Sequence, residues 1–314
     1  MQQSSIRRVA VVGTGTIGMS WTATFLARGI EVRASDPAPG AEARLRHFID
    51  AAWPALARLG PVVATPPQHL LIFCADAETA VADADFVQES APEREAIKQA
   101  LLARLDAALP PETVIASSSS GLLVSRLVAS CRHPERVVIG HPFNPPHLIP
   151  LVEVVGGART APAAIERAME FYSSIGKRPI HIRREVAGHV ANRLQAALWR
   201  EAVHLLAGGV ASVADIDAAI SEGPGLRWAL MGPHLTFHLA GGSGGIAHFL
   251  EQLGPPLESW WDDLGSPRLT PEICQVLAAG VIAEAGGRDI AALAAERDRF
   301  LVDLLALKNA RRDE

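Results

Sequence analysis

A glycine-rich turn near the start of the chain constrains its fold more than any other stretch. Gly13 to Gly18 read GTGTIG, the pattern G-x-G-x-x-G, and they follow an apolar run at residues 9–12. In a strand–turn–helix unit the first glycine permits the tight turn, the second lets a pyrophosphate reach the backbone, and the third lets the helix pack on the strand. The pattern predicts a dinucleotide site. Its predicted contacts are Gly13, Gly15, Thr16, Ile17 and Gly18.

An acidic residue stands where such a turn requires one. Asp36 directly follows a second apolar segment, residues 30–35, and lies 23 positions after Gly13. A carboxylate near this separation accepts hydrogen bonds from the ribose hydroxyls of NAD, and its charge repels the 2′-phosphate of NADP. We therefore predict NAD as the cofactor, although Arg33 lies close enough to leave NADP as an alternative.

Short apolar runs alternate with longer helical patterns through the first half of the chain. Extended segments are expected at 7–13, 30–35, 69–74, 85–89, 113–117, 136–140, 151–155 and 179–183. Beyond about residue 186 the apolar positions recur only at helical spacing. This order predicts an α/β fold, with a Rossmann-type, doubly wound, mostly parallel sheet in residues 1–186 and an all-helical domain in residues 187–314.

Composition excludes several classes of protein. The formal net charge of −5 argues against a nucleic-acid surface, which needs clustered Lys and Arg. The three cysteines lie far apart, which suits a reducing cytoplasm rather than a disulfide framework. The N-terminal segment has no signal-peptide core, and no apolar run reaches the roughly eighteen residues of a membrane span. We expect a cytoplasmic protein that binds neither membranes nor nucleic acids.

Two further patterns are weak. His234 and His238 have the i, i+4 spacing of a metal pair, but no third ligand accompanies them, and we predict no metal. The segment GGSGG at 241–245 resembles a phosphate loop by composition alone. It lacks the Lys-Ser/Thr that follows a P-loop, so we expect a turn between helices.

Polar residues stand at three positions beyond the nucleotide half. Ser120 follows the run ASSS, His141 follows the segment at 136–140, and Glu153 lies inside the apolar run LVEVV. Ligands of parallel sheets bind beyond the carboxyl ends of the strands, so Ser120 and His141 are expected in one crevice. A buried glutamate needs a partner, and a histidine base needs one ring nitrogen fixed. The sequence predicts a His141–Glu153 pair that is either catalytic or a structural clamp on the proline-rich loop between them.

Several motifs together resemble one family. They are GxGxxG, then SSGL, HPFNP, LVEVVGG and AGHVANR, and they are similar to the 3-hydroxyacyl-CoA dehydrogenase family across nearly the whole chain. The runs QESAPERE (88–95) and ALWREAVHL (197–205) are most similar to the L-carnitine dehydrogenase branch of this family, which also includes lambda-crystallin. Many relatives carry Pro-Gly-Phe or Pro-Gly-Tyr where this chain has Ala187, Gly188 and His189.

The resemblance implies a role for each matching residue. His141 corresponds to the catalytic base and Glu153 to the carboxylate that orients it. Ser120 and Asn192 correspond to the groups that contact the substrate oxygen and the nicotinamide region. Glu89 and Lys98 correspond to residues near the nicotinamide ribose.

The resemblance also implies a reaction and leaves its substrate open. We expect NAD-dependent oxidation of a small 3-hydroxy acid, above all L-carnitine to 3-dehydrocarnitine, by a homodimer. A 3-hydroxyacyl-CoA such as 3-hydroxybutyryl-CoA is an alternative, as is L-gulonate; the first would need basic residues that the helical half mostly lacks. A third alternative is a non-catalytic NAD-binding protein of the crystallin type.

Candidate substrate contacts lie in the helical half. Trp199 and Trp228 offer aromatic faces of the kind that bind a quaternary ammonium group. Arg193 offers a guanidinium fork for a substrate carboxylate. Core or dimer packing is the alternative for the tryptophans, and a solvated or structural role is the alternative for the arginine.

Overall fold

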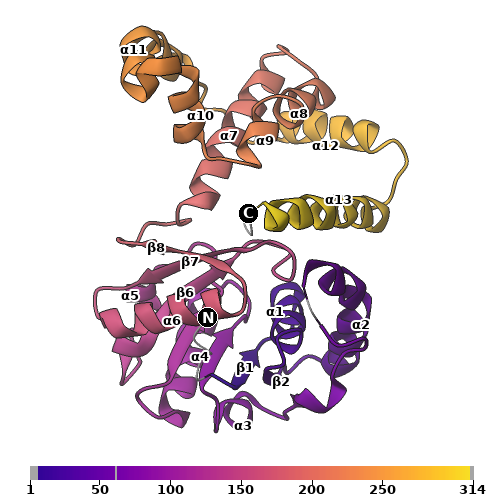
Figure 1. Cartoon of the computed structure of the whole chain (residues 1–314), viewed down its shortest axis with the longest axis vertical. Coiled ribbons are helices and arrows are strands. Elements are labelled where there is room, and N and C mark those ends of the chain that lie inside the picture. Colours follow the sequence, from indigo (N-terminus) through magenta and orange to yellow (C-terminus); the bar gives the residue numbers. More distant parts are fainter. Residues whose placement is uncertain (1–5, 61, 312–314) are drawn as a thin grey trace. The chain divides into compact units, whose positions relative to one another are not determined.

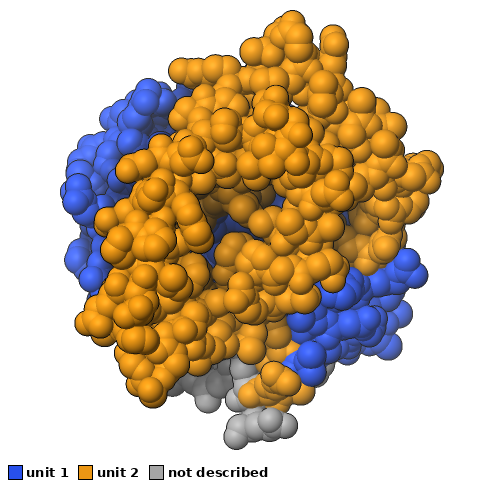
Figure 2. Space-filling view, turned by 90° about the horizontal axis from the view of Figure 1, so that it is seen from above, with its two compact units in different colours: residues 1–192, 298–307 blue, residues 193–297, 308–314 orange. Residues whose placement is uncertain are grey.

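The computed structural model describes residues 6–60 and 62–311. These residues fall into two compact units (Figure 2). Unit 1 takes in the chain through Asn192 together with Asp298–Leu307, and unit 2 takes in Arg193–Arg297 and the described residues from Lys308 onward.

Unit 1 is built on one eight-stranded sheet (Figure 1). Its strands are β1 (Arg8–Val12), β2 (Glu31–Ser35), β3 (Leu71–Phe73), β4 (Phe86–Glu89), β5 (Val114–Ser117), β6 (Val137–Pro142), β7 (Leu151–Gly156) and β8 (Arg178–Ile182). The spatial order is β3-β2-β1-β4-β5-β6-β7-β8, and only the β6–β7 pairing is antiparallel. The order reverses direction at β1, between β2 and β4, which is where a doubly wound sheet opens a ligand crevice.

Helices cover both faces of this sheet. They are α1 (Thr16–Leu26), α2 (Ala41–Leu59), α3 (Ala77–Val81), α4 (Glu95–Ala108), α5 (Val124–Leu127) and α6 (Pro162–Ser174). Val9 and Val11 of β1 pack with α1, α2 and α6 in one apolar core, whereas Ala10 and Val12 pack with α3, α4 and α5 in another. Alternate residues of a strand point to opposite faces, so a strand buried on both sides reads as the continuous apolar run seen in the sequence.

Unit 2 is helical. Its helices are α8 (Val213–Ser221), α9 (Pro224–Trp228), α10 (Pro233–Ala240), α11 (Gly245–Asp263) and α12 (Pro271–Ala285). Two further helices are shared with unit 1, namely α7 (Ala191–Ala207) and α13 (Ile290–Ala310). No helix among the described residues is long and apolar enough to cross a membrane.

The sequence-based expectation of the fold is confirmed, with shifts at the ends of elements. All eight expected strands are present, and the segment at 241–245 forms a tight 3₁₀ turn, η3 (Gly242–Gly244), and the first residue of α11. One position differs: the strand expected to end before His141 continues through Pro142. His141 therefore lies inside β6, where backbone pairing with β7 sets its position.

Candidate active site

The glycine turn packs too tightly for any larger residue at two of its three positions. Gly13 has a φ of +91°, and a Cβ there would lie 2.7 Å from the backbone of Ser90 at the end of β4. A Cβ on Gly18 would lie 1.8 Å from the carbonyl oxygen of Gly13. These contacts press α1 against β1, and they fix the turn at the crevice where the strand order reverses.

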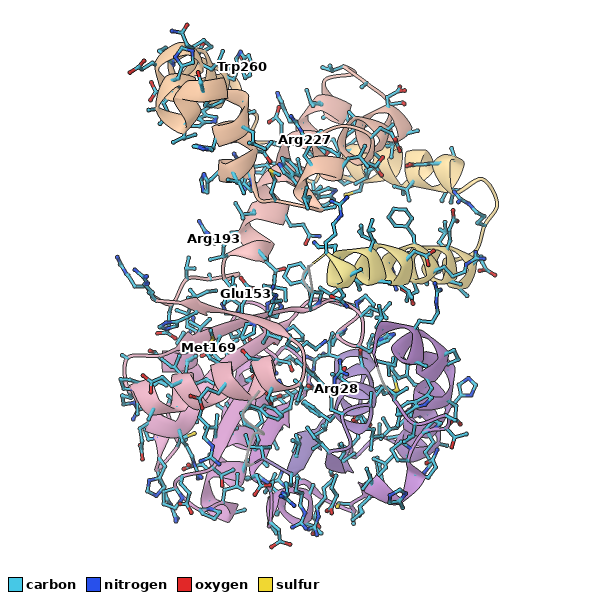
Figure 3. All side chains as sticks on the ribbon, viewed as in Figure 1. Arg28, Glu153, Met169, Arg193, Arg227 and Trp260 are labelled. Carbon is cyan, nitrogen blue, oxygen red and sulfur yellow. The ribbon has the colours of Figure 1, made fainter. Side chains whose placement is uncertain are left out.

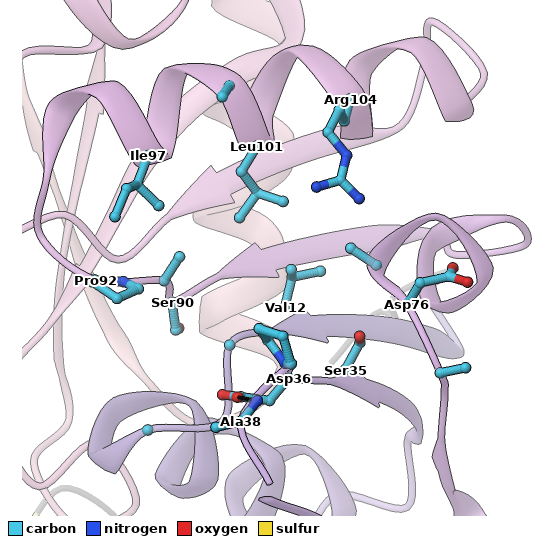
Figure 4. Close-up of a pocket in the computed structure, with 17 residues that line it drawn as sticks. Val12, Ser35, Asp36, Ala38, Asp76, Ser90, Pro92, Ile97, Leu101 and Arg104 are labelled. Carbon is cyan, nitrogen blue, oxygen red and sulfur yellow. Dashed lines mark hydrogen bonds between the residues drawn. The ribbon is translucent and has the colours of Figure 1, made fainter.

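A cavity of about 810 Å³ opens beside this turn (Figure 4). Its lining comes from the ends of β1, β2 and β4 and from α4, and includes Gly13, Gly15, Asp36, Ser90 and Leu101. Asp36 accepts hydrogen bonds from the backbone N–H groups of Thr14 at 2.7 Å and Ala38 at 2.8 Å. Each carboxylate oxygen keeps a further lone pair, so the fixed carboxylate can still accept from the two ribose hydroxyls of NAD.

Three details of the cavity fit NAD. A Cβ on Gly15 would meet nothing within 4 Å, so space is open where a pyrophosphate approaches the turn. The hydroxyl oxygen of Thr14 is buried and has no hydrogen-bond partner among the described residues, so it is free to bond a phosphate oxygen. Arg33 faces Glu31 at 3.6 Å and Asp83 at 3.3 Å. It is therefore not directed at a 2′-phosphate, as NADP would require.

His141 and Glu153 are paired as the sequence predicted. The two residues are cross-strand neighbours in the antiparallel β6–β7 register. Nδ1 of His141 lies 2.8 Å from Oε2 of Glu153, and both side chains are buried. Because a carboxylate can only accept, Nδ1 carries the hydrogen and Nε2 presents a lone pair. This is the tautomer that a general base needs.

Glu153 also holds the start of helix α7. Its second oxygen, Oε1, accepts from the backbone N–H groups of Val190 and Ala191, each at 2.9 Å. A carboxylate at a helix N-terminus satisfies free amides and favours the helix dipole. Burial alone would raise the pKa of Glu153, but the hydrogen bonds that it accepts outweigh burial and hold this pKa below its ordinary value of 4.5. Glu153 (Figure 3) is therefore ionised beside the imidazole at neutral pH.

The proline-rich loop between β6 and β7 is fastened at two points. Nζ of the buried Lys177 donates to the carbonyl oxygens of Pro146 and, at 3.2 Å, Ile149. Ser20 on α1 bonds both the backbone N–H of His147, at 2.7 Å, and its ring nitrogen Nδ1, at 2.8 Å. Burial, with a smaller contribution from the positive charge of Arg28, lowers the pKa of Lys177 to about 7. The stiff loop thus returns the chain to β7 at a fixed place, which positions Glu153 opposite His141.

Glu89 and Lys98 form a buried ion pair. Nζ of Lys98 lies 2.8 and 3.0 Å from the two oxygens of Glu89, and both side chains are at most 1% exposed. Glu89 also accepts from the hydroxyl of Ser117 and the N–H of Ala91. With these bonds the two charges of the pair are satisfied within the protein, so the pair stabilises the ends of β4 and β5. Their contact with the nicotinamide ribose stays a prediction.

Glu93, which the sequence patterns did not single out, lies between β4 and α4 and bonds the residues that follow β5. Its Oε1 accepts from the hydroxyl of Ser119 at 2.7 Å and from the backbone N–H groups of Ser120 at 2.9 Å and Gly121 at 3.1 Å. Its side chain is 40% exposed. Burial would raise the pKa of Glu93, but these hydrogen bonds and the charge of Lys98 hold the pKa below its ordinary value.

Ser120 and Asn192 are brought together. Nδ2 of Asn192 donates to the carbonyl oxygen of Ser120 at 3.0 Å, across 72 positions of sequence. The hydroxyl of Ser120 lies 3.3 Å from Glu93 and is exposed. The ring of His189 lies between these residues and the dyad, 5.3 Å from the ring of His141 and bonded to Ser119.

The predicted substrate residues Arg193, Trp199 and Trp228 lie in unit 2, where Arg193 is labelled in Figure 3. Trp199 is 50% exposed and lines a cavity of about 580 Å³. The same cavity is lined by the acidic residues Asp217, Glu222 and Glu284, and its described lining contains no Lys or Arg. Trp228 is not among the residues that line it. No group of three or more His, Cys, Asp or Glu in the described chain is arranged to hold a metal.

Both halves of the chain match family models. The model of the 3-hydroxyacyl-CoA dehydrogenase NAD binding domain matches residues 8–186, and that of the 3-hydroxyacyl-CoA dehydrogenase C-terminal domain matches residues 188–280. An L-carnitine dehydrogenase of Streptomyces griseus is 58% identical over 300 residues, covering 96% of this chain and 89% of the relative. An L-carnitine dehydrogenase of Pseudomonas aeruginosa is 50% identical over 302 residues, covering 96% and 94%.

Solved structures show the same fold. A 5-formyl-3-hydroxy-2-methylpyridine 4-carboxylic acid 5-dehydrogenase, described as an NAD⁺-dependent dismutase, matches with a TM-score of 0.82 at 32% identity, covering 95% of this chain and 97% of that one. The 3-hydroxybutyryl-CoA dehydrogenase of Escherichia coli K12 matches with a TM-score of 0.64 at 32% identity, covering 75% of this chain and 50% of that one. These matches confirm the NAD-binding α/β fold and the NAD cofactor.

Gly15→Ala should weaken NAD binding and leave stability unchanged, whereas Gly18→Ala should lower the stability of the fold. The Cβ at residue 15 enters open space at a φ of −70°, so the melting temperature should hold while the Kd for NAD rises about tenfold or more. The Cβ at residue 18 overlaps Gly13, which should lower the free energy of unfolding by about 1–3 kcal/mol. Titration calorimetry measures the Kd for NAD, and thermal unfolding measures the stability. Unchanged NAD affinity in Gly15→Ala would contradict the predicted NAD site.

Glu153→Gln should flatten the acid side of the stability curve. The folded-state pKa of Glu153 is lowered, so its contribution is fully present above pH 4.5 and is lost as the pH falls through the lower folded value. Below pH 4.5 the wild type should therefore lose up to about 1.4 kcal/mol more per pH unit than the variant. Urea unfolding between about pH 3 and about pH 7 brackets this titration and measures the difference in the free energy of unfolding. The exposed Glu166→Gln is the matched control. Parallel curves would refute the argument.

Proposed function

Because the chain belongs to the 3-hydroxyacyl-CoA dehydrogenase family, we propose that it oxidises L-carnitine to 3-dehydrocarnitine with NAD. The observation that carries the proposal is the 58% identity to an L-carnitine dehydrogenase across nearly the whole chain, with the His141–Glu153 pair in place. The domains that we propose are an NAD-binding domain of residues 1–186 and a helical substrate-binding and dimerisation domain of residues 187–314.

The dyad supplies the acid–base chemistry. Nε2 of His141 removes the hydroxyl proton of the substrate, and the carboxylate of Glu153 stabilises the imidazolium that forms. NAD, when bound, accepts the hydride from the carbon that carries the hydroxyl. In the reverse direction His141 returns the proton to the oxygen. We propose that Ser120 and Asn192 hold that oxygen, since the Asn192 amide and the Ser120 backbone are already bonded at 3.0 Å.

The cofactor is held by the residues of the glycine turn and by Asp36. We propose that Gly13, Gly15, Thr16, Ile17 and Gly18 contact the pyrophosphate and that Asp36 contacts the adenosine ribose. The free N–H groups at the N-terminus of a helix such as α1 suit a phosphate. We propose Glu93, with Glu89 and Lys98, as a residue near the nicotinamide, because the carboxylate of Glu93 is exposed whereas the Glu89–Lys98 pair is enclosed.

Trp199 is the stronger of the two proposed contacts for a trimethylammonium group. Its exposed ring lines a cavity whose other polar groups include Asp217, Glu222 and Glu284. An aromatic face and carboxylates both attract a cation, whereas a CoA phosphate would be repelled by them. Arg193 remains our proposal for the substrate carboxylate. We propose that the reaction takes place in the cytoplasm, where thiols such as those of the free cysteines Cys74, Cys131 and Cys274 stay reduced.

His141→Ala should abolish NADH formation with L-carnitine while NAD binding stays nearly intact. Loss of a general base lowers kcat by about 10²–10⁴-fold. The exposed His181→Ala serves as the matched control and should keep full activity. Absorbance of NADH is followed with L-carnitine, 3-hydroxybutyryl-CoA and L-gulonate in parallel. Reduction only with one of the latter two would replace the substrate, and reduction with none would favour the non-catalytic alternative.

We also propose a homodimer formed through the helical unit. Large apolar side chains are exposed on it, among them Trp260 at 62% (Figure 3), Trp261 at 63% and Ile282 at 72%. Sedimentation should give twice the 33.3 kDa of one chain. Replacing both tryptophans by Arg should weaken self-association, and Glu258→Arg on the same helix is the control. A monomer at every concentration would exclude the dimer.

A further inference from the structure

His189 lies in the loop before α7 in a conformation that the backbone does not favour. Its φ is 50°, in the left-handed region, and it is the single non-glycine residue of the described chain with a positive φ. The side chain is 1% exposed. Histidine tolerates this region better than most residues do, but such geometry is kept only when the surroundings enforce it.

One ring nitrogen of His189 has a partner. Nε2 lies 3.0 Å from the carbonyl oxygen of Ser119, at the end of β5. A carbonyl can only accept a hydrogen bond, so Nε2 carries the hydrogen. In the neutral ring Nδ1 is then an acceptor with a free lone pair.

The second ring nitrogen of His189, Nδ1, is buried and has no hydrogen-bond partner among the described residues. The centroid of this ring lies 5.3 Å from that of His141. A buried acceptor left unsatisfied is costly, and such groups are rare in folded proteins.

Burial keeps the ring of His189 neutral. Burial lowers the pKa of His189 and the neighbouring His141 lowers it further, against the raising effects of the Ser119 hydrogen bond, Glu153 and Glu93. A neutral ring leaves the lone pair of Nδ1 available, and it adds no positive charge next to the imidazolium that forms on His141 during the reaction.

We propose that Nδ1 of His189 accepts a hydrogen bond from an N–H or O–H group of the ligand bound at the dyad. His189 is then a recognition residue that selects ligands carrying a donor at this point. In a substrate–NAD pair the donor with the required chemistry is the carboxamide of the nicotinamide, because the single hydrogen of the substrate hydroxyl goes to Nε2 of His141. His141 is not the donor before proton transfer, because its own hydrogen is on Nδ1 and bonded to Glu153. The donor belongs to the cofactor and does not depend on which substrate the protein oxidises.

The test compares paired ligands that differ only in the donor. NAD is paired with its 3-acetylpyridine analogue, which has a methyl in place of the amide N–H₂. L-carnitine is paired with 4-trimethylammoniobutanoate, which lacks the hydroxyl. His189→Phe keeps a flat ring and removes the acceptor. His189→Asn keeps an acceptor near the position of Nδ1 and suits a positive φ.

In His189→Phe, NAD should lose about 5- to 20-fold more affinity than its 3-acetylpyridine analogue. The L-carnitine pair is the control, and its two members should weaken equally; a selective loss for L-carnitine would contradict the carboxamide as the donor. His189→Asn should restore part of the difference. Equal weakening of both members of each pair would mean a purely structural role and overturn the proposal. If the wild type does not oxidise L-carnitine, the proposed function fails while the cofactor pair still decides on His189.

Discussion

A single buried carboxylate organises the surroundings of His141 in unit 1. Glu153 accepts from the imidazole of His141 and from the amides of Val190 and Ala191. The ionised group is taken fully out of water, which is tolerable only because both oxygens are bonded. One interaction thereby fixes the tautomer of the base, its orientation on β6, and the place where helix α7 begins.

The surroundings of the dyad serve to keep that geometry fixed. The antiparallel register of β6 and β7 puts His141 and Glu153 opposite one another, and the loop that joins the strands is stiffened by prolines and held by Lys177 and Ser20. A lysine buried without a carboxylate is costly. Nζ of Lys177 donates instead to backbone carbonyl groups of the loop, so burial of this lysine serves to hold the loop in place.

Charge is divided between the interior and the surface of the crevice. Glu89 and Lys98 neutralise one another beneath the strand ends, where neither is exposed. The carboxylates of Glu93 and Asp36 are less buried, and backbone N–H groups help to fix the positions of both. Glu93 also lies 3.8 Å from Nζ of Lys98. Such preorganised groups need little rearrangement when a ligand binds. A second imidazole, that of His189, is held neutral beside the base.

The sequence by itself determined the fold class, the cofactor and the pairing of His141 with Glu153. These follow from local patterns: G-x-G-x-x-G after an apolar run, an acid at the end of the second strand, and alternating strands and helices. Local spacing did not reveal that Glu153 caps α7, that Glu89 is enclosed while Glu93 faces outward, or that His189 bonds Ser119 across 70 positions. Those facts depend on which distant segments meet and how deeply each group is buried. Only the packed tertiary structure decides them, because burial and long-range contacts are properties of the folded chain rather than of neighbouring residues.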